Sequence, residues 1–270
     1  MNNALFVNSQ QMDFANKQAI ADAFGKAAAS YDKHAAFQRE VGSRLLDLLP
    51  QDLRGKQVLD LGCGTGFFSQ QLLARGAQVV CCDLSSEMLQ QAQARCGHQG
   101  MQYQQGDAES LPFAAHQFDY VFSSLALQWC DDLSVPLAEM RRVTRRGGSI
   151  VFSTLLDGSL NELKQAWAKV DSYQHVNDFI TANQVKIALA QAQCKNHHLD
   201  LPTIIAWYSS AFSLMRDLKG IGANHVQGRS HGLTSRQSLK RLEREYQNFQ
   251  HNHQGLVPAT YQVCLGKINL

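Results

Sequence analysis

A glycine-rich turn that follows an acidic residue is the part of this chain best suited to bind a ligand. Residues 58–66 read VLDLGCGTG, in which Asp60 interrupts an apolar run. Glycine has no Cβ atom, so the backbone can adopt unusual dihedral angles there and a ligand can approach it closely. We expect a buried strand, a tight turn and then a helix whose free N–H groups point at the same place. The ligand-binding residues expected here are Asp60, Gly62, Cys63, Gly64, Thr65 and Gly66.

The spacing of the turn separates two classes of ligand. Dinucleotide sites use G-x-G-x-x-G, whereas this chain has D-x-G-x-G-x-G. A carboxylate at the end of the strand would repel a pyrophosphate and suits a cationic ligand, directly or through water. The pattern resembles motif I of the methyltransferases that use S-adenosylmethionine (SAM), a donor with a sulfonium and an α-ammonium. A tight turn without a ligand is the alternative.

A second acidic residue, Asp83, ends the short apolar stretch AQVVCCD. A carboxylate at the end of the second strand can accept hydrogen bonds from both ribose hydroxyls of a cofactor. Asp83 could instead be the N-cap of the helix SSEMLQQAQARC, although Ser85 could cap that helix equally well. We favour the ribose role, and we expect Leu84 and Met88 to contact the cofactor beside it.

Further strand ends carry the remaining cofactor candidates. Asp107 follows the expected third strand, MQYQQ, and the methyltransferase resemblance implies that Asp107 and Ala108 bind the adenine ring. Ser124 and Leu125 stand at the exit of the fourth strand, FDYVFSS. Five strand–helix steps predict a doubly wound parallel sheet, and such sheets bind ligands at the carboxyl ends of their strands.

Composition limits the class of protein. The 270 residues are 44% hydrophobic, without a run of eighteen apolar residues or a signal-peptide pattern near the N-terminus. The seven cysteines form no C-x-x-C pair, so we expect reduced thiols, a cytoplasmic protein and no metal site. Cys63 is interpreted as a small residue beside the cofactor rather than a nucleophile. A net charge of +2 does not indicate a nucleic-acid partner.

The expected organisation is an α/β fold whose seven-stranded, mostly parallel, Rossmann-like sheet ends in an antiparallel strand. Residues 1–50 should form an N-terminal helical cap, and residues 51–157 the SAM-binding core. Residues 158–198 should be helices that complete the core and a lid. Residues 199–270 should hold the last two strands, with a basic helical lid inserted at 210–249. Between Arg216 and Glu245 there are seven Lys or Arg residues against three acids. That bias indicates either a solvated helix face or a docking surface for an acidic partner.

The segments before and after the expected SAM-binding core narrow the resemblance to one family of methyltransferases. The strings AFGKAAASYDKHAAFQREVGSRLL, FSSLALQWCDDL and LKGIGANHVQGR, together with the glycine-rich turn, resemble the malonyl-acyl-carrier-protein O-methyltransferases of biotin synthesis over nearly the whole chain. The resemblance implies methyl transfer from SAM to the free carboxylate of a malonyl thioester on an acidic carrier protein, giving the ester that primes pimeloyl synthesis. Such a carboxylate is already ionised at neutral pH, so no general base is expected.

The substrate side is expected to involve residues from both flanks. Tyr31, His34 and Gln38 recur at helical intervals of three and four. We expect Tyr31 to lie near the reacting atoms, because a phenol donates a hydrogen bond without neutralising the nucleophile. The other candidates for the substrate or the carrier protein are His34, Gln38, Lys219, His225 and Arg229. The alternative to a substrate-binding role is that Tyr31 packs on the core and Gln38 lies in solvent.

Two other functions share the core motifs. The chain could be a SAM-dependent methyltransferase for another small molecule, such as a quinone ring or a free acid. It could also be a SAM-binding protein without catalysis. A dehydrogenase is disfavoured by the glycine spacing and by Asp60.

Overall fold

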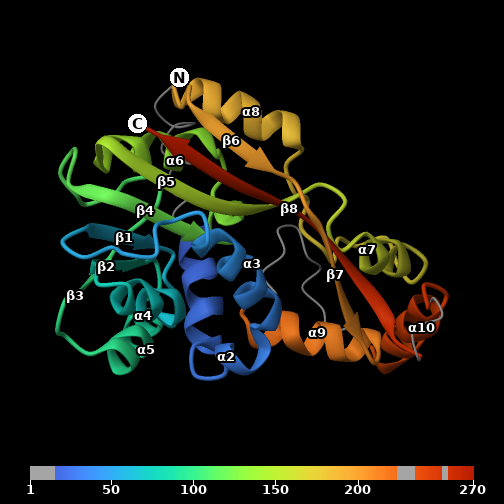
Figure 1. Ribbon diagram of the computed structural model, residues 1–270. Coiled ribbons are helices and arrows are strands. Elements are labelled where there is room, and N and C mark those ends of the chain that lie inside the picture. The colour runs from blue at the N-terminus through green and yellow to red at the C-terminus, as the bar shows by residue number, and fades with distance from the viewer. Residues whose placement is uncertain (1–15, 224–234, 251–254) are drawn as a thin grey trace, which may run out of the picture.

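A single sheet runs through the molecule, with helices on both faces (Figure 1). A computed structural model describes residues 16–223, 235–250 and 255–270. The first five strands are β1 (Gln57–Leu61), β2 (Gln78–Asp83), β3 (Met101–Gln105), β4 (Phe118–Ser124) and β5 (Thr144–Leu156). The last three are β6 (His197–Asp200), β7 (Thr203–Tyr208) and β8 (Val257–Asn269).

The strand order is β3-β2-β1-β4-β5-β8-β6, with β7 also paired to β8. Strands β1 to β5 run parallel, and β8 is antiparallel to β5. This confirms the predicted doubly wound, mostly parallel sheet with an antiparallel final strand. Because β1 lies between β2 and β4, Val58 to Leu61 are all buried, which explains the apolar run around Asp60.

The strand count differs from the expected seven, because the described sheet has eight strands. Strands β6 and β7 pair with β8 in one continuous register, from His197 opposite Ile268 to Tyr208 opposite Val257. They are therefore two halves of one strand that is interrupted at residues 201–202. Pro202 has no N–H group to donate to the ladder, which accounts for the interruption.

Two sets of helices cover the sheet (Figure 1). One face packs against α3 (Ala36–Leu46), α4 (Phe67–Ala74) and α5 (Ser86–Cys96). The other face packs against α6 (Ser134–Val143) and α8 (Ala182–Gln191). Thr181 forms the capping box of α8 with Gln184, as the residue types at that helix start predict.

Five further α-helices are present in the described residues: a helix over residues 16–27, α2 (Tyr31–His34), α7 (Asn161–Ala168), α9 (Ala211–Gly220) and α10 (Arg236–Gln247). Of these, α7, α9 and α10 lie around the extended β7–β8 ribbon, whereas the helix over residues 16–27 and α2 lie between α9 and the rest of the molecule (Figure 1). Helix α9 contacts both α2 and α10, and α10 contacts α7. We call α9 and α10 the lid helices. Chain segments from both flanks of the core therefore meet where α2 contacts α9.

Candidate functional site

The glycine-rich turn has the geometry that its sequence predicts. Gly62, Gly64 and Gly66 all have positive φ angles, of 69°, 53° and 77°. A Cβ atom on Gly62 would lie 2.3 Å from the Cβ of Ala126, so a side chain is excluded there. A Cβ on Gly64 would meet nothing within 4 Å, because this residue borders a cavity. The backbone of the turn is therefore open to a ligand.

That cavity, which we call the first cavity, lies at the carboxyl ends of the parallel strands. Nine of the thirteen predicted cofactor residues line it: Gly62, Gly64, Asp83, Leu84, Met88, Asp107, Ala108, Ser124 and Leu125. The common placement at strand ends explains why residues far apart in the chain meet here.

The other four predicted residues, Asp60, Cys63, Thr65 and Gly66, do not line the first cavity. Asp60 is 2% exposed and lies beneath the turn, where its Oδ2 accepts a hydrogen bond from Ser69 Oγ at 2.5 Å. The pKa of Asp60 is raised to about 7, mainly by burial. The hydrogen bond from Ser69 lowers this pKa, and the negative charge of Asp83 contributes to raising it. Asp60 thus supports the turn from below.

Asp83 orients the glycine-rich turn directly. Its Oδ2 accepts a hydrogen bond from the Gly64 N–H at 2.8 Å, and its Oδ1 accepts one from the Ser85 N–H at 2.9 Å. The N-cap of α5 is Ser85, whose Oγ accepts from the Met88 N–H at 3.3 Å. The alternative interpretation of Asp83 as the N-cap is therefore wrong, and its carboxylate borders the first cavity. Burial raises the pKa of this carboxyl.

Sequence reasoning missed the residues that close the first cavity from the N-terminal side. Lys17, on the helix over residues 16–27, donates to Asp107 Oδ2 at 2.6 Å and lies 2.6 Å from Glu109 Oε2. These contacts raise the pKa of Lys17 despite its partial burial. Phe24 and Trp129, which meet edge to face at 5.3 Å between ring centroids, also line the cavity. Contacts between residues so distant in sequence leave no local pattern.

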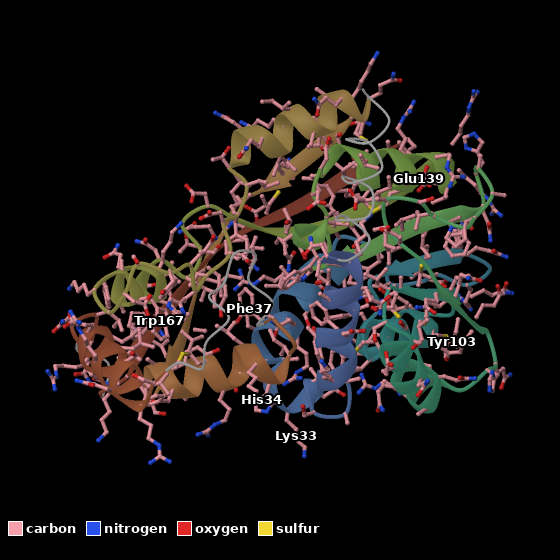
Figure 2. All side chains as sticks on the ribbon, turned by 180° about the vertical axis from the view of Figure 1, so that it is seen from behind. Lys33, His34, Phe37, Tyr103, Glu139 and Trp167 are labelled. Atoms are coloured by element: carbon pink, nitrogen blue, oxygen red, sulfur yellow. The ribbon has the colours of Figure 1, made fainter. Side chains whose placement is uncertain are left out.

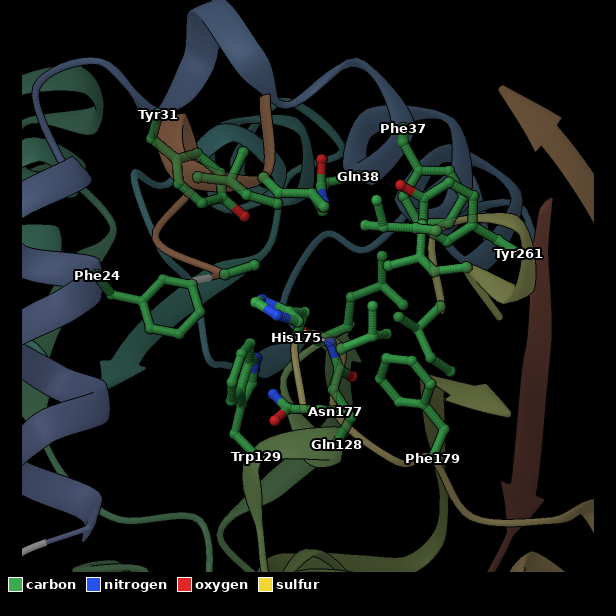
Figure 3. A pocket seen from close by; sticks show the side chains of 18 residues that line it. Phe24, Tyr31, Phe37, Gln38, Gln128, Trp129, His175, Asn177, Phe179 and Tyr261 are labelled. Carbon is green, nitrogen blue, oxygen red and sulfur yellow. Dashed lines mark hydrogen bonds between the residues drawn. The ribbon is translucent and has the colours of Figure 1, made fainter. Parts of the chain in front are cut away.

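A second cavity adjoins the first (Figure 3). Phe24, Tyr31, Leu125 and Trp129 line both cavities, so Tyr31 lies at their junction. Burial raises the pKa of Tyr31, and the charges of Asp83 and Asp32 add to the effect, so the phenol is protonated at neutral pH. Gln38 also lines the second cavity, and its Oε1 is buried.

The structure does not bring His34 into the second cavity. A continuous helix would align Tyr31, His34 and Gln38, but the chain breaks at Ala35, between α2 and α3. His34 instead packs against Gly220 of α9, and its Nδ1 lies 2.7 Å from Asp217 Oδ1 (Figure 2). His34 therefore does not line the second cavity with Tyr31 and Gln38 but lies at an outer groove with Lys219, and its expected role in binding the substrate or the carrier protein stays a prediction.

The remaining substrate candidates lie elsewhere. Lys219 lines an outer groove between α9 and the helix over residues 16–27, together with Lys26 and Arg216. Lys219 therefore points away from the second cavity. His225 and Arg229 lie outside the described residues.

A polar network fixes α2 against the glycine-rich turn. Thr65 Oγ1 donates to Asp32 Oδ1 at 2.8 Å, and Arg95 of α5 pairs with the other oxygen of the same carboxylate. Asp32 directly follows Tyr31, so the network links the turn to the residue at the junction of the cavities. The hydroxyl of Thr65, predicted as a cofactor contact, is used in this network.

Across residues 16–223, 235–250 and 255–270, no group of three or more His, Cys, Asp or Glu side chains could hold a metal ion. Within the same ranges, no helix has the length and apolar character needed to cross a membrane.

Comparison with known proteins identifies the class. Residues 59–152 match the model of a methyltransferase domain. The fold resembles the YcgJ protein of Bacillus subtilis, with a TM-score of 0.60 at 16% identity over 85% of this chain and 97% of that one. It also resembles phosphoethanolamine N-methyltransferase 2 of Haemonchus contortus, solved with S-adenosylhomocysteine, with a TM-score of 0.54 at 17% identity over 86% and 52%. The chain is a class I SAM-dependent methyltransferase, which confirms the predicted enzyme class and cofactor.

A closer relationship defines the family. The chain is 45% identical over 257 residues to the malonyl-[acyl-carrier protein] O-methyltransferase of Serratia marcescens, covering 95% of this chain and 97% of that one. It is 45% identical over 254 residues to the protein of the same name from Pectobacterium atrosepticum, covering 94% and 96%. The chain belongs to the malonyl-[acyl-carrier protein] O-methyltransferase family, and the predicted resemblance is confirmed.

The first cavity fits the methyl donor. The Asp83 and Asp107 carboxylates line it and can accept hydrogen bonds from hydroxyl and amino groups, which SAM carries on its ribose and adenine. The open space at Gly64 admits a ligand where a side chain would otherwise project.

Proposed function

We propose that this chain transfers a methyl group from SAM to the free carboxylate of a malonyl thioester carried by acyl carrier protein. The product is the methyl ester that primes biotin synthesis. The observation that carries the proposal is the position of Tyr31 in the lining of both cavities. A donor in the first cavity and an acyl group in the second would meet beside this phenol.

The chemistry requires positioning rather than proton transfer. When bound, SAM supplies an electrophilic methyl group: a carboxylate oxygen bonds to the methyl carbon while the carbon–sulfur bond breaks and its electron pair stays on sulfur. A carboxylate with an ordinary pKa of about 4 is already ionised, so no base is needed. The protonated phenol of Tyr31 can donate a hydrogen bond that orients the anion. Phe24 and Trp129 exclude water from the junction.

For the cofactor, we propose that Asp83 accepts hydrogen bonds from the ribose hydroxyls and that Asp107 and Ala108 face the adenine. Asp83 is held in place by two backbone N–H groups and borders the first cavity, which supports the ribose role. Asp107 is paired with Lys17, so this lysine and the adenine amino group would share one carboxylate.

For the carrier protein, we propose docking on the basic outer surface of the lid helices. Helix α9 turns Leu218 and Ile221 into the second cavity, while Arg216 and Lys219 are exposed on its outer side. Glu245 of α10 pairs with Lys169 at 3.4 Å and not with Arg241, so Arg241 is not neutralised by the acid one helical turn away. An acidic partner would find the exposed cations Arg216, Lys219, Arg236, Lys240, Arg241 and Arg244.

The expected division of the chain into a cap at 1–50, a core at 51–157, completing helices at 158–198 and a lid-bearing end at 199–270 remains a proposal. So does the cytoplasmic location, which the seven free thiols support.

The test is mass spectrometry of malonyl carrier protein after incubation with the enzyme and SAM. A gain of one methyl group supports the proposal if alkaline hydrolysis of the product then releases malonate and methanol. A C-methyl product would release methylmalonate instead, and an N-methyl group would stay on the protein. Free malonate and a quinone, assayed in parallel, test the alternative substrates. Methylation of either of these with none of the carrier-bound malonyl group would overturn the proposal.

A further inference from the structure

The second cavity has a mainly apolar wall that includes Phe37, stacked on Tyr261 at 3.8 Å between ring centroids. Polar atoms interrupt this wall at a few points. Two of them are amide oxygens, Gln38 Oε1 and Gln128 Oε1, which are buried without a hydrogen-bond partner among the described residues. A buried acceptor without a donor is unfavourable, so both oxygens are suited to a ligand that brings donors.

Gln128 is oriented by its other amide atom. Its Nε2 donates to the Leu125 backbone oxygen at 2.7 Å, which leaves Oε1 as the unpaired atom. Gln128 lies in the short 3-10 helix η1 (Leu127–Trp129), next to Trp129 at the junction of the two cavities. The hydrogen bond from Nε2 therefore holds the side chain in place and fixes the position of Oε1.

His175 supplies a third acceptor. Its ring stacks on Trp167 at 3.7 Å with an interplanar angle of 10°, and its Nε2 lies 2.8 Å from Asp171 Oδ1. A carboxylate oxygen only accepts, so Nε2 carries a proton, and in the neutral form of the ring Nδ1 is an acceptor. None of the hydrogen bonds among the described residues uses this Nδ1. Figure 3 shows the ring in the cavity, between the side of Tyr31 and that of Gln128.

We propose that the second cavity binds the pantetheine arm that carries the acyl group, and that Gln38, Gln128 and His175 accept hydrogen bonds from the amide N–H and hydroxyl donors of the arm. This inference rests on the proposed function. A malonyl group has only acceptor oxygens and cannot satisfy these three atoms, whereas the first amide of the arm lies a few bonds beyond the thioester sulfur. The methylene segments of the arm match the apolar wall.

The consequence is a division of roles along the substrate. Tyr31, a donor, lies where the anionic carboxylate reacts. The three acceptors repel a carboxylate and attract an amide N–H, so they favour the orientation with the carboxylate at the junction. Free malonate has no amide, and the cavity discriminates against it for the same reason.

The test compares two thioesters, malonyl-N-acetylcysteamine and its N-methyl amide analogue, which lacks the N–H but keeps the chain length. With the wild-type enzyme, N-methylation is expected to raise KM about threefold to tenfold, the effect of one lost hydrogen bond, with little change in kcat. One of the two glutamines is expected to accept the hydrogen bond from this amide. When that glutamine is replaced, in Gln38→Leu or in Gln128→Leu, the KM values of the two thioesters should become equal. Gln191→Leu, at an exposed position of α8, is the matched control and should keep the wild-type ratio.

Malonyl carrier protein gives a second measurement. Gln38→Leu and Gln128→Leu should raise its KM by a similar factor, while SAM affinity measured by calorimetry stays unchanged. Equal KM values for the two thioesters with the wild-type enzyme, or an unchanged KM for the carrier protein in both variants, would overturn the inference. The proposed function would survive either result, because it fails only if malonyl carrier protein is not methylated at all.

Discussion

Replacing Asp60 by asparagine tests the electrostatics beneath the glycine-rich turn. Burial moves the pKa of this carboxyl from an ordinary 3.8 to about 7 in the folded chain. Between these two values the folded chain retains a proton that the unfolded chain has lost, so the free energy of unfolding decreases as the pH rises. A difference of about three pKa units corresponds to about 4 kcal/mol, of which about 2 to 3 kcal/mol falls between pH 5 and pH 8.

Asparagine keeps the shape and an acceptor for Ser69 Oγ but does not titrate. Urea unfolding of the ligand-free wild-type and Asp60→Asn proteins at pH 5 and pH 8 measures the difference. The wild-type protein should lose about 2 to 3 kcal/mol more than the variant over this range. The free energy of unfolding of the variant, measured relative to that of the wild-type protein, should therefore be higher at pH 8 than at pH 5.

The control is Asp52→Asn. Arg54 lowers the pKa of Asp52 to about 2, and this carboxyl is exposed. The control should therefore keep the pH dependence of the wild-type protein. Identical pH dependence in the wild-type and Asp60→Asn proteins would refute the reasoning, since it would mean that Asp60 is ionised in the folded state at pH 5.

Three further perturbations separate the roles proposed for the site. Tyr31→Phe should lower kcat/KM for malonyl carrier protein about tenfold through loss of one hydrogen bond to the anion, while SAM affinity measured by calorimetry stays unaltered. An unchanged kcat/KM would show that Tyr31 does not contact the reacting carboxylate. Asp83→Ala should weaken SAM binding by about 1 to 3 kcal/mol in the same calorimetric assay, and equal affinity would exclude the ribose contact. Lys219→Glu should raise KM for malonyl carrier protein at low salt and spare malonyl-N-acetylcysteamine; the docking idea fails if both substrates respond alike.

The cofactor side of the site was predictable because its residues stand at strand ends. A short apolar stretch followed by an acid can be recognised locally, and the parallel topology then brings the ends of β1 to β4 to one edge. The same reasoning could not distinguish residues that line the cavity from residues that support it. Asp60 lies near the end of β1 and Asp83 at the end of β2, yet Asp60 is buried and Asp83 borders the first cavity.

The substrate side was less predictable because segments from both flanks build it. Gln128 and His175 reach the second cavity from the middle of the chain, and Tyr31 reaches it from the N-terminal side. Such contacts depend on how helices pack, which no local spacing encodes. A single break at Ala35 was enough to separate His34 from its expected neighbours.

Helix α9 links the two proposed recognition events. Its inner side contributes Leu218 and Ile221 to the second cavity, and its outer side carries Arg216 and Lys219. A carrier protein held by the outer cations would lie one helix diameter from the cavity that receives its arm. The contact of His34 with Asp217 and Gly220 fixes α9 against α2, the helix that carries Tyr31. The proposed docking surface and Tyr31 are therefore joined by the packing of α2 on α9, and we expect docking and alignment of the acyl group to be coupled through this packing.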